Sequence, residues 1–286
     1  MLAYMLAYML AYMLAYMLAY MPAHMLTHMH TPVSFVRDGA IGTVTLSTPG
    51  KLNALSVAHW ESLQDTMRTV ALGAGLRAIV VRGADANFAA GADIGEFQTV
   101  RANVADGTRY HEETVKGALL AIAECPVPTV ALIEGACVGG GLEIACSCDL
   151  RIAGESSRFG VPINRLGFPL AHSEMTGLLA LAGKAVTLEI LLEGRVFGAR
   201  EAYDKGLLTR IVADAAVEQE AYATAARIAA GGPNAARANK RWVRRLMAAA
   251  APLDEAEVRE HFAFFDTDEY REGVRAFLAK TKPDFK

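Results

Sequence analysis

The chain has 286 residues, of which 53% are hydrophobic and 21% charged, and its formal net charge is -3. This length allows one large domain, or a domain with an appendage, to bury a full core. No basic stripe is present to neutralise a phosphate backbone, so the composition argues against a nucleic-acid-binding protein. The four cysteines lack CxxC spacing and lie in apolar segments. They indicate reduced core thiols of a cytoplasmic protein rather than a metal or redox site.

Residues 1–30 differ in kind from the rest of the chain. The tetrapeptide MLAY is repeated five times over residues 1–20, and MPAHMLTHMH follows it. A helix of about 20 such residues has the length to span a bilayer, but no positively charged region precedes this run and no small-residue cleavage site is clear. We interpret residues 1–30 as a leader that is disordered or that arises from a repeated coding segment or an overlong start. We expect no membrane contact.

The segment from residue 31 to 230 alternates strands and helices. In chain order, the apolar patterns predict a strand within 39–49, a helix after the N-cap Ser56, buried strands over 77–83 and 129–135, a helix over about 108–124, and a strand over 148–154. Glycine- and alanine-rich loops separate these elements. Such alternation predicts an α/β core with parallel strands.

The chain beyond about residue 172 is predominantly helical in pattern, with one more short strand near 208–212. Gly231-Gly232-Pro233 predicts a boundary, followed by a helical region over 231–286. Apolar side chains recur there at helical spacing, among them Phe262, Phe265, Val274 and Phe277. This spacing fits ordinary packing within the chain or contact with another subunit. We expect the region to take part in oligomerisation.

The stretch ACVGGGLEIAC, residues 136–146, places three glycines between a predicted strand and a predicted helix. Backbone amides at a helix start lack intrahelical acceptors, and glycines let a ligand lie against them. The stretch matches neither the GxGxxG of a dinucleotide site, nor a Walker loop, nor the GxSxG of a nucleophile elbow. The remaining interpretation is an oxyanion hole that uses the Gly140 amide, with a second amide from Ala92 in the loop FAAGAD.

The motifs KLNAL (51–55), FAAGADI (88–94), GACVGGGLEIACSCDLRIA (135–153), FGVP (159–162) and DEYREGVRAFLAKTKPDFK (268–286) carry a family resemblance. Together they resemble the crotonase, or enoyl-CoA hydratase/isomerase, superfamily over residues 33–286. The resemblance implies a spiral of ββα repeats with a C-terminal helical region, assembled as a homotrimer or homohexamer. It also implies acyl-CoA thioesters as ligands and an enolate held by two backbone amides.

The resemblance assigns roles to individual residues. The two oxyanion amides fall on Ala92 and Gly140, and Glu143 falls on one of the two catalytic glutamates of the hydratases. Burial raises the pKa of a carboxyl group and a helix start lowers it, so the sequence does not decide the direction of the shift for Glu143.

The resemblance also implies a binding site for the CoA part of the substrate. Lys51, Ala54 and Ala90 lie where the family lines this site, and Phe277 and Lys280 match a C-terminal pair that contacts CoA. In some members that pair comes from a neighbouring subunit. The thioester is the substrate, and we expect neither a further cofactor nor a metal.

The chain departs from the hydratase pattern at the second catalytic glutamate. An ungapped reading of FGVPINRLGFP places Ile163 there, and the adjacent Asn164 is no acid. Nearby, His172 and Glu174 provide titratable groups in a segment that also departs from the pattern. The simplest interpretation is that both are surface residues at the start of a helix. Loss of one general acid or base typically costs ~10²–10⁴-fold in rate, which argues against strong hydratase activity.

Two functions therefore remain open from the sequence. In the first, the protein is a hydratase, isomerase or related lyase in which Glu143 works alone or with an unexpected partner. In the second, it is a catalytically weak or silent acyl-CoA-binding protein. The presence of Glu143 and of both oxyanion positions favours the enzyme. A dinucleotide-dependent oxidoreductase is a distant third.

Overall fold

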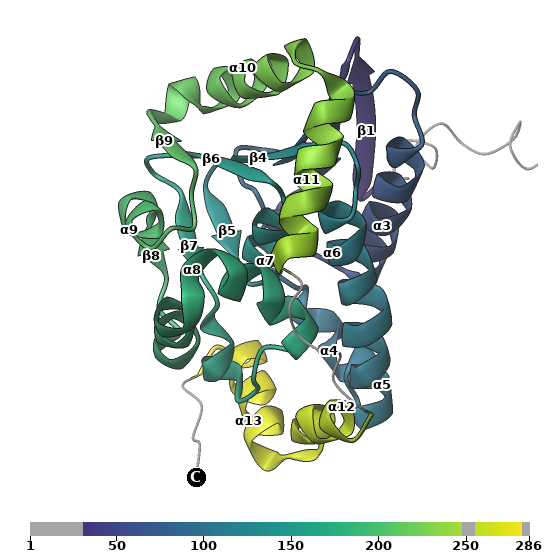
Figure 1. Cartoon of the computed structure of the whole chain (residues 1–286). Coiled ribbons are helices and arrows are strands. Elements are labelled where there is room, and N and C mark those ends of the chain that lie inside the picture. Colours follow the sequence, from purple (N-terminus) through teal and green to yellow (C-terminus); the bar gives the residue numbers. More distant parts are fainter. Residues whose placement is uncertain (1–30, 248–254, 282–286) are drawn as a thin grey trace, which may run out of the picture. The chain divides into compact units, whose positions relative to one another are not determined.

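The computed structural model describes residues 31–247 and 255–281, and those from Pro32 onward belong to one compact unit (Figure 1). The predictions for residues 1–30, including the leader, lie outside the described residues. The predicted boundary near Gly231 stays a prediction.

The main sheet is built from strands that lie far apart in the sequence. Its order is β1-β2-β3-β4-β6-β9. The strands are β1 (Val33–Asp38), β2 (Ile41–Leu46), β3 (Ala78–Gly83), β4 (Thr129–Ile133), β6 (Leu150–Gly154) and β9 (Arg210–Val212). The β1–β2 pair is antiparallel and every following pair is parallel, with Val44 opposite Val81 and Val81 opposite Ala131. All residues of β4 are buried, as its unbroken apolar sequence predicts.

A second, smaller sheet is formed by short strands. It consists of β5 (Ala136–Val138), β7 (Arg158–Gly160) and β8 (Phe197–Gly198), in the order β5-β7-β8. In the chain, β5 follows the main-sheet strand β4, and β7 follows β6. Two isolated bridges, Leu55 with Ala92 and Ala89 with Cys137, continue the same kind of pairing in the preceding turns. Each turn thus adds one strand to the main sheet, a short extended segment beside it, and then a helix. This repetition brings the loops of successive turns side by side.

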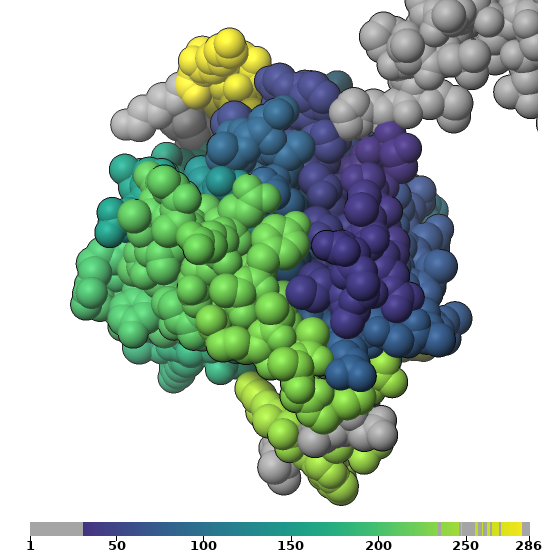
Figure 2. All heavy atoms as spheres, turned by 90° about the horizontal axis from the view of Figure 1, so that it is seen from above, coloured from purple at the N-terminus to yellow at the C-terminus, as the bar shows by residue number. Residues whose placement is uncertain are grey.

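Helices cover both faces of the main sheet. The helices before residue 231 are α3 (Val57–Ala71), α4 (Phe97–Val100), α5 (Val104–Arg109), α6 (Lys116–Ala123), α7 (Gly140–Ser147), α8 (His172–Glu193), α9 (Ala199–Asp204) and α10 (Val217–Ala230). Val80 and Val130 face α10, whereas Val81 and Ala131 on the other face pack in the core that contains α3, α6 and α7. In the space-filling view α10 lies beside the first strands, and Tyr222 on α10 is 2.9 Å from the Thr43 hydroxyl of β2 (Figure 2).

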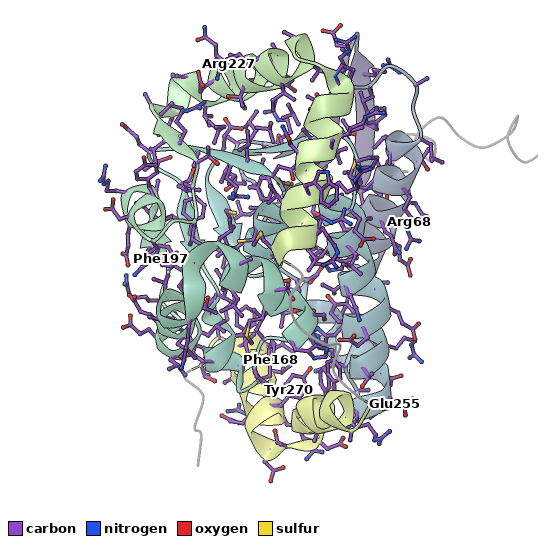
Figure 3. All side chains as sticks on the ribbon, in the orientation of Figure 1. Arg68, Phe168, Phe197, Arg227, Glu255 and Tyr270 are labelled. Carbon is purple, nitrogen blue, oxygen red and sulfur yellow. The ribbon has the colours of Figure 1, made fainter. Side chains whose placement is uncertain are left out.

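The C-terminal region contains α11 (Pro233–Met247), α12 (Glu255–Phe262), the 3₁₀ helix Ala263–Asp266 and α13 (Asp268–Leu278). Phe262, Phe265 and Val274 are buried within the chain, in a cluster that also holds Phe168 and Tyr270. The rings of Phe168 and Tyr270 meet edge to face at 5.7 Å between centroids (Figure 3). Ordinary packing therefore accounts for these predicted apolar positions.

Several expected elements differ in detail. The helix predicted over 108–124 begins earlier, at Val104, and passes through a π-helical turn, Tyr110–Val115, before α6. The glycine run does not follow the long buried strand directly, because the short strand β5 lies between them. Strands of two or three residues such as β8 and β5 carry too little periodicity to be predicted.

Helix α8 is the one described helix that is long and apolar enough to cross a membrane by length and composition. Its backbone breaks at Gly183, where φ is +68° and ψ is 175°. Neither half therefore reaches the about 20 residues that a straight membrane-spanning helix needs.

Candidate active site

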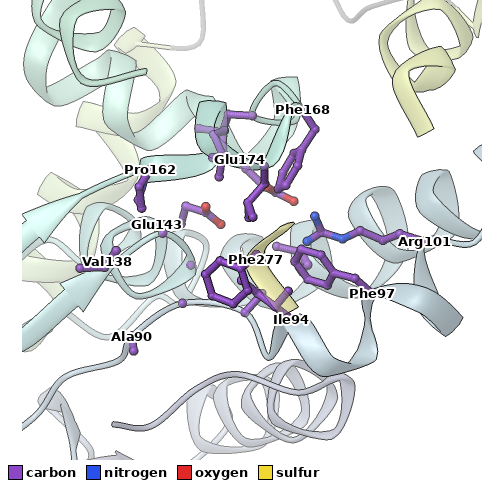
Figure 4. A pocket seen from close by; sticks show the side chains of 18 of the residues that line it. Ala90, Ile94, Phe97, Arg101, Val138, Glu143, Pro162, Phe168, Glu174 and Phe277 are labelled. Carbon is purple, nitrogen blue, oxygen red and sulfur yellow. The ribbon is translucent and has the colours of Figure 1, made fainter. Parts of the chain in front are cut away.

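A cavity of about 360 Å³ lies where the glycine loops, the first turn of α8 and α13 meet (Figure 4). Most of its lining is apolar. Its charged lining residues are Arg101, Glu143, Glu174 and Arg165, and the first three are buried. An apolar cavity with a few buried polar groups is the usual form of a small-molecule site.

Of the eight residues that the resemblance assigns to catalysis or to CoA binding, five line this cavity. They are Ala90, Ala92, Gly140, Glu143 and Phe277. The other three, Lys51, Ala54 and Lys280, are not part of its lining. The fold thus brings the residues of the predicted amides, the predicted acid and one C-terminal residue together from three separate stretches of chain.

One wall of the cavity is made of backbone from two loops, Ala90–Ala92 and Val138–Gly140, which we call the backbone wall. Gly91 has φ +97° and Gly139 has φ +52°, both in the region that favours glycine. A Cβ atom on Gly91 would lie 3.0 Å from the Val138 carbonyl oxygen and 3.6 Å from the Gly140 nitrogen. The two loops touch, and a side chain at Gly91 would press against the Val138 carbonyl.

The amides of Ala92 and Gly140 are left available by the local hydrogen bonding. Leu55 pairs with the Gly91 carbonyl and the Asp93 amide, at 2.8 Å each, so the Ala92 amide between them points away from Leu55. Gly140 is the first residue of α7, where an amide has no intrahelical acceptor. In the part of the chain that the structure describes, neither amide donates to a backbone carbonyl outside regular helices and strands.

The segment Lys51–Leu55 supports the backbone wall from outside the cavity. Asn53 is buried, and its Nδ2 donates to the Ala84 carbonyl at 2.8 Å. The exposed Lys51 ammonium pairs with Asp93 at 2.8 Å, directly after Ala92. Ala54 closes a turn on the Lys51 carbonyl at 3.0 Å. Lys51 and Ala54 therefore lie next to the wall without lining the cavity.

Of the predicted C-terminal pair, Phe277 lines the cavity and Lys280 does not. Phe277 on α13 lines the cavity and is 53% exposed, so it covers the opening only in part. Lys280 is exposed outside the lining, and its φ of +55° turns the chain so that Thr281 reaches the cavity instead.

Glu143 lies on α7, in the turn that follows the Gly140 amide, and is 8% exposed. Burial raises the pKa of its carboxyl group well above the ordinary value, the nearby Glu174 raises it further, and Arg101 acts in the opposite direction. The helix start does not outweigh the burial. Burial therefore favours the neutral, protonated form of Glu143.

Glu174 is a buried residue of the cavity, so its interpretation as a surface residue is wrong. It lies in the first turn of α8, which packs against α7 and the π-helical turn, and it is 6% exposed. Burial raises its pKa to about 8, partly offset by Arg101. Figure 4 shows the Glu143 and Glu174 side chains entering the cavity from separate helices. His172 does begin a helix as expected, and its side chain is 24% exposed.

His111, from the π-helical turn, positions Glu174. Its Nδ1 lies 2.5 Å from Glu174 Oε1, and its ring stacks on Phe262 at 5.6 Å between centroids. Burial lowers the pKa of His111 well below its ordinary value, so the ring is neutral. While Glu174 is protonated, its O–H donates to Nδ1. Helix α12 thus helps to hold Glu174 in place indirectly, because its Phe262 ring stacks on His111.

Arg101 directly follows α4 and is 5% exposed. Its guanidinium carbon lies 3.6 Å from the ring centroid of Phe97, 4.7 Å from that of Tyr110 and 5.0 Å from that of Phe168. Within the described residues its Nε and Nη1 atoms have no hydrogen-bond partner. Figure 4 shows the guanidinium entering the cavity from the side of Phe97.

Similarity to known proteins identifies the family of the chain. Residues 37–286 match the family model described as enoyl-CoA hydratase/isomerase. The chain belongs to the enoyl-CoA hydratase/isomerase family. It is 34% identical to a probable enoyl-CoA hydratase of Rhizobium meliloti (strain 1021), over 87% of this chain and 95% of that protein.

Solved structures of the enoyl-CoA hydratase/isomerase family share the fold. An enoyl-CoA hydratase/carnithine racemase from Magnetospirillum magneticum is 44% identical, with a TM-score of 0.75 over 89% of this chain and 95% of that one. A methylmalonyl-CoA decarboxylase complexed with 2S-carboxypropyl CoA is 26% identical, with a TM-score of 0.81 over 90% of this chain and 98% of that one. The predicted family and the predicted crotonase-like fold are confirmed, and the similar structures include more than one reaction.

The departure from the hydratase pattern of this family has a structural counterpart. Ile163 lines the cavity, so an aliphatic side chain occupies the position where the resemblance expects a glutamate. Asn164 donates its Nδ2 to the Leu192 carbonyl at 2.7 Å and is not part of the lining. The second carboxyl group of the cavity comes from Glu174, eleven positions further along the chain than Ile163.

Sequence reasoning missed Arg101, His111 and the aromatic rings around them. Arg101 follows FQTV in a segment without a motif, and His111 precedes two glutamates in a helical pattern. Nothing local in the sequence separates these two residues from exposed charges on helices. Only the packing of α12 and α13 against the core shows that they are buried.

Proposed function

We propose that the protein is an enzyme that transforms acyl-CoA thioesters through an enolate, with the Ala92 and Gly140 amides as the oxyanion hole. The observation that supports the proposal is the contact between two glycine loops whose residues Ala92 and Gly140 line one cavity beside a buried glutamate. Backbone N–H groups that the fold already holds in place, in a site without water, stabilise the negative charge that develops on the thioester oxygen, because no group has to reorient during the reaction. Family membership and the CoA ligand named for a similar structure support a thioester as the substrate.

Glu143 and Glu174 are proposed as the proton-transfer pair. Their carboxyl groups influence each other's charge and both have raised pKa values. Glu174, whose pKa burial raises to about 8 and whose Oε1 lies 2.5 Å from His111 Nδ1, is the proposed base, and Glu143, whose pKa burial raises well above its ordinary value, is the proposed acid. Two carboxyl groups in one site divide such roles in this way.

Two reactions fit this division of roles. In hydration, Glu174 takes a proton from water, the water oxygen bonds to the β-carbon, and the π electrons of the double bond form the enolate. Glu143 then protonates the α-carbon, and the thioester carbonyl reforms. In isomerisation, Glu174 takes a γ-proton and Glu143 supplies the α-proton, without added water. In both reactions Ala92 and Gly140 hold the enolate oxygen.

The CoA part of the substrate is proposed to lie along the outside of the backbone wall. Lys51 and Lys280 are exposed cations near the cavity loops and suit phosphate groups, while Ala54 and Ala90 are small enough for close approach. Phe277 would cover the acyl end from the mouth. The proposed reaction needs neither a further cofactor nor a metal. A homotrimeric or homohexameric assembly and a cytoplasmic location stay predictions.

Two measurements test this function. Calorimetric titration with a short acyl-CoA is expected to show saturable binding. Incubation with a panel of enoyl-CoA and acyl-CoA thioesters, followed by mass spectrometry and by NMR, is expected to show gain or loss of water or movement of a double bond. Absence of heat and of any thermal shift at millimolar acyl-CoA would contradict the proposal.

Ile163 in the cavity is the observation that favours the second candidate, an acyl-CoA-binding protein without catalysis. That candidate predicts saturable binding together with no change in any thioester of the panel. Turnover that disappears in Glu143→Gln would exclude it.

A further inference from the structure

The guanidinium of Arg101 has no part in the proposed proton transfers, yet it is buried at the cavity. The Tyr110 hydroxyl is its polar neighbour, and its Nε and Nη1 atoms have no partner among the described residues. The three aromatic rings around it stabilise a cation through their faces, and of these three residues only Tyr110 has a hydroxyl oxygen that can accept from an N–H group. A buried, charged donor without an acceptor costs free energy, and a ligand that supplies an acceptor would recover it.

The carboxyl groups of the cavity do not fill this role. Arg101 favours the charged forms of Glu143 and Glu174, yet in the described chain it forms no ion pair with either. Oε1 of Glu174 is taken by His111, and burial raises the pKa values of both glutamates, which favours their neutral forms. The remaining charged lining residue, Arg165, is exposed and positive. Among the described residues, the buried Arg101 guanidinium therefore has no carboxylate paired with it.

We propose that Arg101 binds a carboxylate carried by the acyl group, so that the substrates are carboxyl-bearing acyl-CoA thioesters. This inference rests on the proposed function, because the thioester end of the same ligand occupies the Ala92 and Gly140 amides. The carboxylate accepts hydrogen bonds from the free N–H atoms, and its charge balances the guanidinium in an apolar surrounding. Charge-assisted hydrogen bonds of this kind are the strong ones in proteins. Arg101 is then a specificity-determining residue.

The test compares ligands that differ only at the far end of the acyl chain. Malonyl-, succinyl- and glutaryl-CoA are titrated beside propanoyl-, butanoyl- and pentanoyl-CoA, the neutral thioesters with the same number of carbons. At the best chain length we expect the carboxyl-bearing thioester to bind the wild-type protein about 10- to 100-fold more tightly than its neutral counterpart. Saturated chains avoid turnover by hydration during the titration.

Variants at position 101 separate recognition from a structural role. Arg101→Gln is expected to bring the affinity ratio of the paired thioesters to about one while neutral thioesters still bind. Arg101→Lys retains a cation in the aromatic surroundings, so we expect it to keep part of the preference for carboxyl-bearing thioesters. It provides a second test at this position if Arg101→Gln does not fold. Arg109→Gln, an exposed arginine that pairs with Asp106, is the matched control and leaves the ratio unchanged.

The outcomes distinguish this inference from the function on which it rests. Equal affinity for every pair in the wild type, or a ratio that is unchanged in a folded Arg101→Gln protein, overturns the carboxylate assignment while CoA binding stands. Failure of all the thioesters to bind overturns the proposed function and the inference together.

Discussion

One side of the cavity is formed mainly by backbone atoms and the opposite side by side chains. The backbone wall consists of Ala90–Ala92 and Val138–Gly140, which successive turns of the spiral place side by side. The opposite side, which we call the side-chain wall, consists of Arg101, Glu174 and the rings around them, supplied by α4, α8 and the C-terminal helices. The repeating pattern of the fold determines the first wall. Long-range packing, which differs from one sequence to another, determines the second.

This difference suggests a division of tasks. Backbone amides recognise a carbonyl oxygen whatever acyl group it carries, so the backbone wall suits a feature shared by all thioesters. Side chains distinguish acyl groups and move protons at chosen carbons, so the side-chain wall suits the features that vary between reactions. The substitutions below test whether the two walls fail in different ways.

The largest effect is expected for Glu143→Gln, on the helix that joins the two walls. The amide keeps the shape of the side chain but supplies no acidic proton, so turnover on the best thioester falls by ~10²–10⁴-fold, as is usual for loss of a general acid or base. Binding stays within about tenfold, because the change acts on the transition state. Steady-state kinetics and calorimetry measure the two quantities, and Glu113→Gln, an exposed glutamate, is the control. Full activity in Glu143→Gln would place the chemistry elsewhere.

Gly140→Ala tests the backbone wall. A Cβ atom there would lie 2.8 Å from Trp60 Cζ2 and 3.2 Å from Leu55 Cδ1, both in fully buried side chains. The start of α7 must shift, and with it the amide. Loss of one oxyanion donor costs ~10²–10³-fold in kcat, and all thioesters are affected alike. Gly198→Ala, whose Cβ would meet only the flexible end of Arg158 at 3.3 Å, is the matched control. A loss confined to one acyl chain would contradict the task assigned to this wall.

Glu174→Gln tests the side-chain wall through its pH dependence. The proposed base works only when ionised, so wild-type turnover rises with pH and levels off above a midpoint near the Glu174 pKa of about 8. The amide cannot ionise. We expect turnover to fall by ~10²-fold and the rise around pH 8 to disappear. Rates from pH 6 to pH 9 in the wild type and in Glu174→Gln decide this. A variant that retains the rise would show that another group is the base.

The predictability of the two walls follows from how each is encoded. Buried strands such as β3 and β4 and the glycine turn before Glu143 were predicted because their signals are local and strong. The roles of the amides came from the resemblance. The burial of Glu174 was not predicted, since it depends on α8 packing against distant segments. Arg101 was not predicted either, because its aromatic surroundings come from three separate stretches of chain.

The smallest effect is expected for Ile163→Glu, which restores a carboxyl group where the resemblance expects one. Ile163 lines the cavity and packs against both the main core and the C-terminal cluster, so the new group enters a partly apolar place without prepared hydrogen bonds. Hydration of crotonyl-CoA is expected to rise by less than about tenfold, because a carboxylate needs supporting contacts to be placed productively. Kinetics of the wild type, Ile163→Glu, Glu143→Gln and the double variant on this substrate measure the gain and its dependence on Glu143. A gain that persists in the double variant would show that the new glutamate acts without Glu143. If a folded Ile163→Glu protein binds the thioester but hydrates it no faster than the wild type, Glu174 already fills the role of the missing residue. A third carboxyl group in the cavity then adds nothing to the reaction.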